Sequence, residues 1–162
     1  MKHYQIEGNT IVLSVKKAPV LARLTLFFIA FALFLLPLIG IIVGLLWGNE
    51  FRIGALFAYV IFGLIGFYTL RMALWNAYGK ETIKLNDKTV AYEADFGWFK
   101  DGDKEVYSKN PILSIKQVGY EEDNKGVLVI SGDQEEIATV VKMPITQIEE
   151  LIERLKDLTK MT

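Results

Sequence analysis

The sequence contains no cysteine and a single histidine, His3. Without cysteine the chain has no disulfide framework and no thiolate metal site. His3 lies near one end of the chain, with no set of acidic or hydroxyl residues around it. The sequence also lacks a glycine-rich phosphate loop, a Ser/His/Asp set and zinc-ligand spacing. We therefore predict no catalytic residue, no cofactor and no metal, and we do not expect an enzyme.

Charge is missing from two long stretches. No Asp, Glu, Lys, Arg, His, Asn or Gln occurs from Leu24 to Gly48 or from Ile53 to Leu70. As helices rising about 1.5 Å per residue these runs would measure roughly 37 Å and 27 Å, against a bilayer core of about 30 Å. A core helix of a soluble protein usually keeps a polar stripe, and the apolar region of a signal peptide is shorter. We predict a transmembrane helical hairpin in residues 19–78, with spans at about 24–47 and 53–74.

The cations beside the two runs indicate how the hairpin is oriented. Lys16, Lys17 and Arg23 precede the first span, and Arg71 and Lys80 follow the second. Positively charged flanks stay in the cytoplasm. We therefore predict a multi-pass protein of the plasma (inner) membrane, with both termini cytoplasmic and a short connecting loop outside.

Small residues recur along both predicted spans. Gly40, Gly44 and Gly48 are spaced four residues apart, and Gly54 and Ala58 repeat this spacing in the second span. Small residues let helix backbones approach closely in lipid. These five positions are predicted to pack helices together, either within the hairpin or along a homodimer seam. The uncharged runs of the two spans bury no ionisable group, so no ion or proton pathway is indicated.

The two halves of the chain differ in charge. Residues 1–79 carry six Lys and Arg against two acidic residues, whereas residues 80–162 carry twelve against seventeen. Nucleic-acid binding needs a cationic face, which this acidic half does not provide. The same balance disfavours broad electrostatic docking on anionic lipid. We expect no nucleic-acid partner.

Strand patterns lie on both sides of the hairpin. Tyr4–Val15 is typical of a β-hairpin turning at Gly8 and Asn9. Because a lone two-stranded hairpin is marginally stable in water, it is expected to join a sheet from the C-terminal half, although the sequence leaves open that it stands apart. In residues 79–162, Val90, Tyr92, Ala94 and Phe96 alternate with polar residues as in a half-buried strand. Further strands are predicted at Glu81–Leu85, Ile112–Tyr120, Val127–Ile130 and Ile137–Lys142.

A helix is predicted at residues 146–160. Thr146 and Glu149 fit a capping box, and an apolar face recurs at helical spacing through Ile148, Leu151, Ile152, Leu155 and Leu158. Several short strands followed by one amphipathic helix indicate an α+β domain in residues 79–162.

The order of these elements resembles that of small bacterial two-span membrane proteins with a PH-like domain, of the bacterial PH or YcxB-like type. The resemblance is carried by the two adjacent spans, by segments 110–115 (NPILSI) and 126–130 (GVLVI), and by the 143–146 (MPIT) entry to the last helix. It implies an antiparallel PH-like sheet or barrel capped by the C-terminal helix. It supplies no catalytic residues, and it implies a role in assembly or interaction.

Two turns are candidate partner surfaces. Trp98 and Phe99 place large aromatic side chains beside a turn, where they either join the core or rest on the membrane surface or a partner. Glu121, Glu122 and Asp123 form an acidic loop tip, which is either a solvated turn or a docking patch for a basic partner. We predict an interaction or scaffolding module, anchored in the lipid bilayer, that binds another membrane protein. The alternatives are a self-associating structural protein, which would form a homodimer, and an accessory subunit of a transporter or envelope-assembly complex. Asp101, Asp103 and Glu105 do not fit the calcium-loop pattern, because Gly102 falls between the two aspartates.

Overall fold

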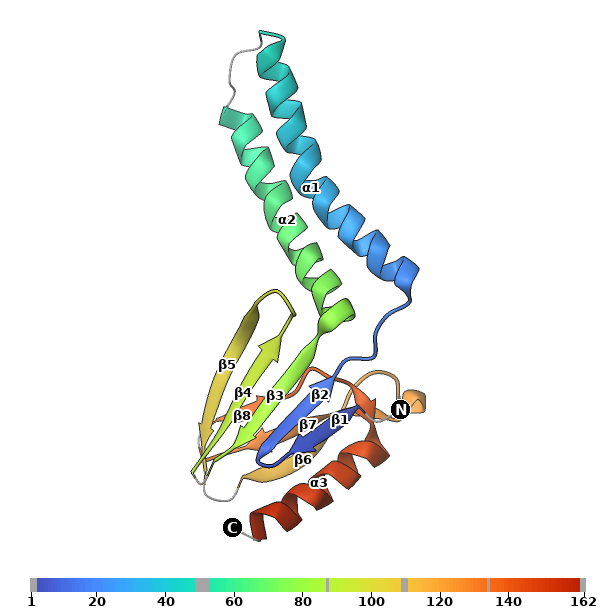
Figure 1. Cartoon of the computed structure of the whole chain (residues 1–162), viewed down its shortest axis with the longest axis vertical. Helices are drawn as coiled ribbons and strands as arrows, with labels where there is room; N and C mark the ends of the chain where they lie inside the picture. The colour runs from blue at the N-terminus through green and yellow to red at the C-terminus, as the bar shows by residue number, and fades with distance from the viewer. Residues whose placement is uncertain (1–2, 49–52, 87, 109–110, 134, 161–162) are drawn as a thin grey trace. The chain divides into compact units, whose positions relative to one another are not determined.

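The computed structural model describes residues 3–48, 53–86, 88–108, 111–133 and 135–160 (Figure 1). The chain divides into two compact units. Met1–Lys16 and Tyr78–Thr162 form the β unit, and Lys17–Ala77 forms the helical unit. The predicted outer loop at residues 49–52 lies outside the described residues. The structure confirms the α+β class, with two long apolar helices, antiparallel sheets and a C-terminal helix.

Two long helices make up most of the helical unit, α1 (Val20–Leu46) and α2 (Ile53–Tyr78). Pro19 immediately precedes α1, and Pro37 lies inside it. Both helices are long and apolar enough to cross a membrane, and only 6% and 11% of their most hydrophobic windows are buried. The apolar side chains of these helices are therefore mostly uncovered by the rest of the protein.

The close approach of α1 and α2 is centred on Gly66. A Cβ added there would lie 3.1 Å from Phe34 Cε2 and 3.3 Å from both Ala30 O and Leu33 Cβ. Ala30 and Gly66 are both buried. The small residue that admits the neighbouring backbone is thus in the second half of α2.

Three of the glycines predicted to pack the helices lie away from this contact. A Cβ added at Gly40, Gly48 or Gly54 would meet no heavy atom within 4 Å, so these three positions do not form the contact between α1 and α2. Ala58 is exposed and Gly44 is half-buried. A seam between two copies of the chain at these positions stays a prediction.

The first sheet of the β unit contains five antiparallel strands in the order β1-β2-β3-β4-β5. The strands before the helical hairpin, β1 (Tyr4–Glu7) and β2 (Thr10–Ser14), form a β-hairpin. The strands after it are β3 (Lys80–Leu85), β4 (Thr89–Asp95) and β5 (Lys100–Tyr107). Because β2 pairs with β3, the N-terminal hairpin is part of this sheet.

The second sheet is antiparallel and centred on β7 (Lys125–Ser131), which pairs with β6 (Ile112–Gln117), β8 (Glu136–Ala138) and β9 (Met143–Pro144). A short 3₁₀-helix, η1 (Glu121–Asp123), connects β6 to β7. The strands predicted to reach Tyr120 and Lys142 therefore end earlier, at Gln117 and Ala138.

The C-terminal helix α3 (Ile145–Lys160) packs against β6, β7 and β9. Thr146 was predicted to cap this helix, but it lies inside α3, whose first residue is Ile145. The N–H of Ile145 donates to Asn124 O at 3.1 Å. The Leu158 side chain lies outside the described residues. The apolar face of α3 is otherwise buried as predicted, through Ile148, Leu151, Ile152 and Leu155.

The core of the β unit draws on both sheets and α3. The alternation predicted for β4 is confirmed, since Val90, Tyr92 and Ala94 are buried while the residues between them are half-buried. The turn after β7 fits closely against the end of β5, because a Cβ at Gly132 would lie 2.8 Å from Tyr107 O. Ile11, Leu13, Ile83, Leu128, Ile130, Ile137 and Met143 are also among the fully buried side chains.

We expect Gly66→Leu to destabilise the helical unit, because the larger side chain must enter the contact with Ala30 and Phe34. Overpacking of this kind costs about 1–3 kcal/mol. Gly54→Leu is the matched control in the same helix, since nothing lies within 4 Å of its added Cβ. Thermal unfolding of helicity in detergent measures both variants, and an equal Tm for the two would contradict this packing.

Candidate functional site

The two aromatic residues predicted as a partner surface, in the turn between β4 and β5, differ in their exposure. Trp98 is exposed over 62% of its surface, whereas Phe99 is half-buried. The Phe99 ring stacks on that of buried Phe96, with centroids 4.9 Å apart and planes 12° from parallel. Phe99 thus belongs to the packing of the turn, and Trp98 is the residue displayed.

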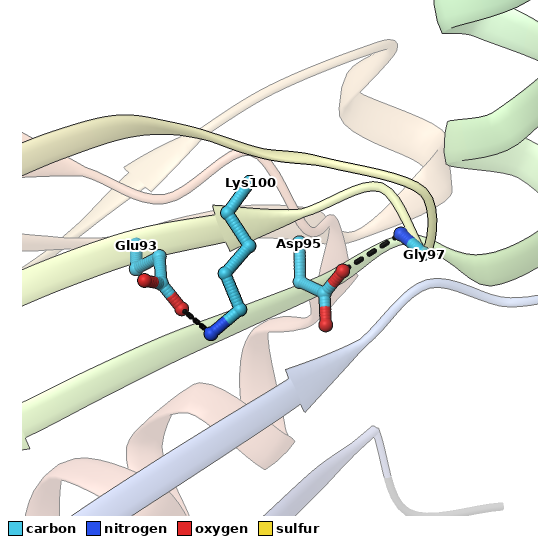
Figure 2. A network of polar contacts seen from close by, with 4 residues as sticks. All are labelled: Glu93, Asp95, Gly97 and Lys100. Carbon is cyan, nitrogen blue, oxygen red and sulfur yellow. Dashed lines mark hydrogen bonds and ion pairs between the residues drawn. The ribbon is translucent and has the colours of Figure 1, made fainter.

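Polar contacts fix the conformation of this turn (Figure 2). Asp95 Oδ1 accepts a hydrogen bond from Gly97 N at 2.7 Å. Phe96 N donates to Phe99 O at 2.9 Å, which closes the hairpin. Gly97 has φ of +87°, a conformation in which side chains are strained, so glycine suits this position.

An ion pair lies on the strands beside the turn. Lys100 Nζ is 2.6 Å from Glu93 Oε1 across β4 and β5. This hydrogen bond, together with the charge of Glu93, raises the pKa of Lys100. Both side chains are partly exposed, so the pair adds little stability.

The predicted acidic surface forms η1, and the structure does not bring it together with the Trp98 turn (Figure 1). Glu122 and Asp123 are exposed, while the side chain of Glu121 lies outside the described residues. Asp123 Oδ2 lies 3.6 Å from Lys125 Nζ. Tyr120, just before η1, is exposed over 82% of its surface. This loop therefore displays one aromatic ring and at least two carboxylates.

The structure contains a buried carboxylate that was not among the residues predicted from the sequence. Glu81 on β3 has no exposed surface, and its Oε1 accepts a hydrogen bond from the Tyr92 hydroxyl at 2.7 Å. Oε1 also accepts from Val140 N, and Oε2 accepts from Val141 N at 3.1 Å. Glu81 and Tyr92 belong to the first sheet, whereas Val140 and Val141 follow β8 of the second. The carboxylate therefore links the two sheets.

Burial has the largest effect on the pKa values of Glu81 and Tyr92. It raises the pKa of Glu81, and the three hydrogen bonds oppose that rise. Burial also raises the pKa of Tyr92, and the negative charge of Glu81 adds to the effect. The available signal in the sequence was strand alternation, which places Glu81 on the same face as Ile83. Enclosed among backbone donors, Glu81 has a structural role.

The other polar candidates form hydrogen bonds within the β unit. His3 N donates to Gln147 Oε1 at 3.4 Å, and the His3 ring Nδ1 lies 3.4 Å from Ser14 O. Asp101 Oδ1 accepts from Gly102 N at 2.7 Å, within strand β5. Within the ranges that the structure describes, no three His, Cys, Asp or Glu side chains are grouped to hold a metal ion.

A pH-dependent stability is expected from Glu81. Because burial raises the pKa of this carboxyl in the folded state, its contribution to stability is complete below the unfolded pKa and is lost as the pH rises through the folded pKa. Glu81→Gln keeps the shape of the protonated acid and does not titrate. We expect the two proteins to have similar Tm values in acid, and the variant to become the more stable one as the pH rises towards neutral.

Thermal unfolding in detergent across this pH range measures the difference, with exposed Glu105→Gln as the control that should follow the parent protein. If Glu81→Gln were the less stable protein at neutral pH, the three hydrogen bonds would outweigh burial and the pKa of Glu81 would be lowered instead.

Comparison with known proteins identifies no relative of this chain. No protein-family model, curated protein or solved structure matches the chain. The residues of the chain itself are therefore the basis for assigning its function.

Proposed function

We propose that this chain is a two-span protein of the bacterial plasma membrane that carries a PH-like interaction or scaffolding module at the cytoplasmic face. The supporting observation is the exposure of α1 and α2. Helices this apolar are normally buried in a core when they belong to a soluble protein, yet nine-tenths or so of their most hydrophobic windows is uncovered. Lipid is the solvent that covers such a surface.

The energetics favour insertion of both helices. The exposed side chains of α1 include Leu21, Phe28, Leu36 and Leu46, and those of α2 include Phe57, Ile61 and Leu64. Each Leu, Ile, Phe or Val near the centre of a span favours insertion by about 0.3–0.6 kcal/mol. In water the same side chains would form a large apolar patch, which is a liability for aggregation.

The pairing of β2 with β3 supports a topology with both termini on one side. β2 precedes α1 and β3 follows α2, and Ser14 lies opposite Lys80 in the shared sheet. Val15 N donates to Gly79 O at 3.1 Å, and Ala18 N donates to Asn76 O at 3.3 Å. A chain that leaves and re-enters one sheet must cross the membrane an even number of times. The cationic flanks then favour the cytoplasm for that side.

An interaction role suits the β unit. It has two antiparallel sheets and a packed C-terminal helix, which is compatible with a PH-like arrangement. Its one fully buried carboxylate among the described residues, Glu81, is enclosed by hydrogen-bond donors and offers no access to a substrate. The displayed groups are instead on loops, which is typical of recognition surfaces.

The loop from Tyr120 to Asp123 is the partner surface that we propose. It combines an exposed aromatic ring with exposed carboxylates, so it suits a basic segment of another membrane protein. Anchoring in the same membrane raises the effective concentration of such a partner, so that a weak contact suffices.

Single-cysteine labelling tests the anchor and its orientation, because the chain has no cysteine of its own. In intact cells, a membrane-impermeant maleimide should label Asn49→Cys and should leave Lys116→Cys unlabelled until the inner membrane is permeabilised. Lys116 is an exposed residue of β6. The cysteine-free parent is the blank. Labelling of Lys116→Cys from outside would reverse the orientation, and recovery of the protein in the soluble fraction would exclude the anchor.

Site-directed photocrosslinking tests the partner surface. A photoreactive residue in place of Glu122 should give a discrete crosslinked band in native membranes, whereas one in place of Lys104, exposed on β5, should not. The adjacent change Asp123→Lys should weaken the band several-fold, because it reverses a charge that attracts a basic partner. Equal crosslinking from both positions, or a band indifferent to Asp123→Lys, would contradict the assignment.

A further inference from the structure

The turn that displays Trp98 packs against the last residue of α2. A Cβ added at Gly97 would lie 2.8 Å from Tyr78 Cβ and 3.0 Å from Tyr78 Cγ, so the glycine backbone rests directly on this tyrosine. Tyr78 ends α2 and belongs to the β unit. It is half-exposed. The β4–β5 turn therefore lies against Tyr78, the residue at which α2 ends.

The turn is built to hold an exposed indole in place. The Asp95–Gly97 hydrogen bond, the Phe96–Phe99 backbone bond and the stacking of Phe96 on Phe99 restrain the residues on both sides of Trp98. A rigid turn loses little conformational entropy when its displayed side chain binds. Trp98 nevertheless keeps 62% of its surface exposed.

We propose that Trp98 inserts into the headgroup region of the bilayer that α1 and α2 span, which gives the β unit a second, non-covalent contact with the membrane. The inference rests on the proposed two-span anchor. Tryptophan and tyrosine are enriched at this level of a membrane because one end of the ring is apolar and the other can hydrogen-bond. Tyr78 at the end of the span and Trp98 beside it extend one aromatic belt from α2 onto the β unit.

Lipid is favoured over a protein partner by this continuity with the span. A protein partner would have to occupy the space next to the point at which α2 emerges, and lipid headgroups already fill that level. The charges near the turn are mixed and do not decide between lipid and protein. Lys80 is exposed two residues after Tyr78, while Lys100 is paired with Glu93 and also lies near Asp95 and Asp103. The contact is therefore expected to depend on the indole rather than on attraction to anionic headgroups.

Fluorescence quenching in nanodiscs tests the contact, since the chain has three tryptophans, Trp47, Trp75 and Trp98. Trp47→Phe with Trp75→Phe leaves Trp98 as the reporter. Nanodiscs of phosphatidylcholine and phosphatidylglycerol are compared with discs in which the phosphatidylcholine carries bromine high on its acyl chain. Bromine quenches at contact, so we expect emission to fall about twofold for an indole at the headgroup level.

The matched control places tryptophan at the other end of β5. Tyr107→Trp, with all three native tryptophans changed to Phe, puts an indole at a site that is 68% exposed in the parent. At about 3.3 Å per residue, Tyr107 lies roughly 23 Å along the strand from Lys100. Brominated lipid should leave its emission unchanged, while iodide in solution should quench it.

A Trp47-only protein separates this inference from the proposed anchor, because Trp47 caps α1 and is exposed. Quenching of Trp47 and of Trp98 by brominated lipid supports both. Quenching of Trp47 alone, with Trp98 open to iodide, leaves the anchor intact and overturns the headgroup contact. A Trp98 shielded from both quenchers is covered by protein and also overturns it. If neither tryptophan meets lipid, the anchor and the contact both fail.

Discussion

The pairing of β2 with β3 is the constraint on which the rest of the β unit depends. These two strands are neighbours inside a five-stranded sheet, yet the whole helical hairpin lies between them in the chain. Without β1 and β2, strand β3 would become an exposed edge and Ile11 and Leu13 would be lost from the core. The sheet can therefore close only after α2 has been made, because the N-terminal hairpin needs β3 as its partner. Such non-local pairing is slow to form.

The two units distribute their apolar side chains in opposite ways. The β unit buries its apolar side chains inward, between the sheets and against α3. The helical unit does the reverse, since Ala30, Gly66 and Ala73 are buried and, apart from buried Leu74, most of the larger side chains are exposed. Small residues at the contact and large ones outside are typical of helices that pack in lipid, where close van der Waals approach replaces the hydrophobic effect. Hydrogen bonds at Val15 and Ala18 bring together the two chain segments that enter and leave the hairpin.

Features that depend on composition or on local periodicity could be predicted from the sequence. The long uncharged runs, the alternation through Val90 and Tyr92, and the apolar face of α3 are of this kind. Features that depend on a distant partner could not. Regular spacing suggested Gly40, but the close approach of the helices is at Gly66, because Ala30 and Phe34 happen to lie opposite it. The strand expected at Ile137–Lys142 ends at Ala138. Thr139 still bonds to Leu128 of β7, but Val140 and Val141 donate to a carboxylate of the other sheet.

That carboxylate shows why a polar group is retained in this core. An apolar residue in place of Glu81 would fill the space and avoid the cost of burying a charge, and such replacements are often neutral or stabilising in other proteins. Here it would leave the N–H groups of Val140 and Val141 and the Tyr92 hydroxyl without an acceptor, and each unpaired buried group costs about 1–3 kcal/mol. The segment after β8 could then satisfy its backbone by extending β8 along β7, which would separate it from the first sheet. Glu81 excludes that alternative, because three hydrogen bonds form together when the two sheets take their observed places. The contribution of Glu81 is thus to specificity of the fold more than to its stability.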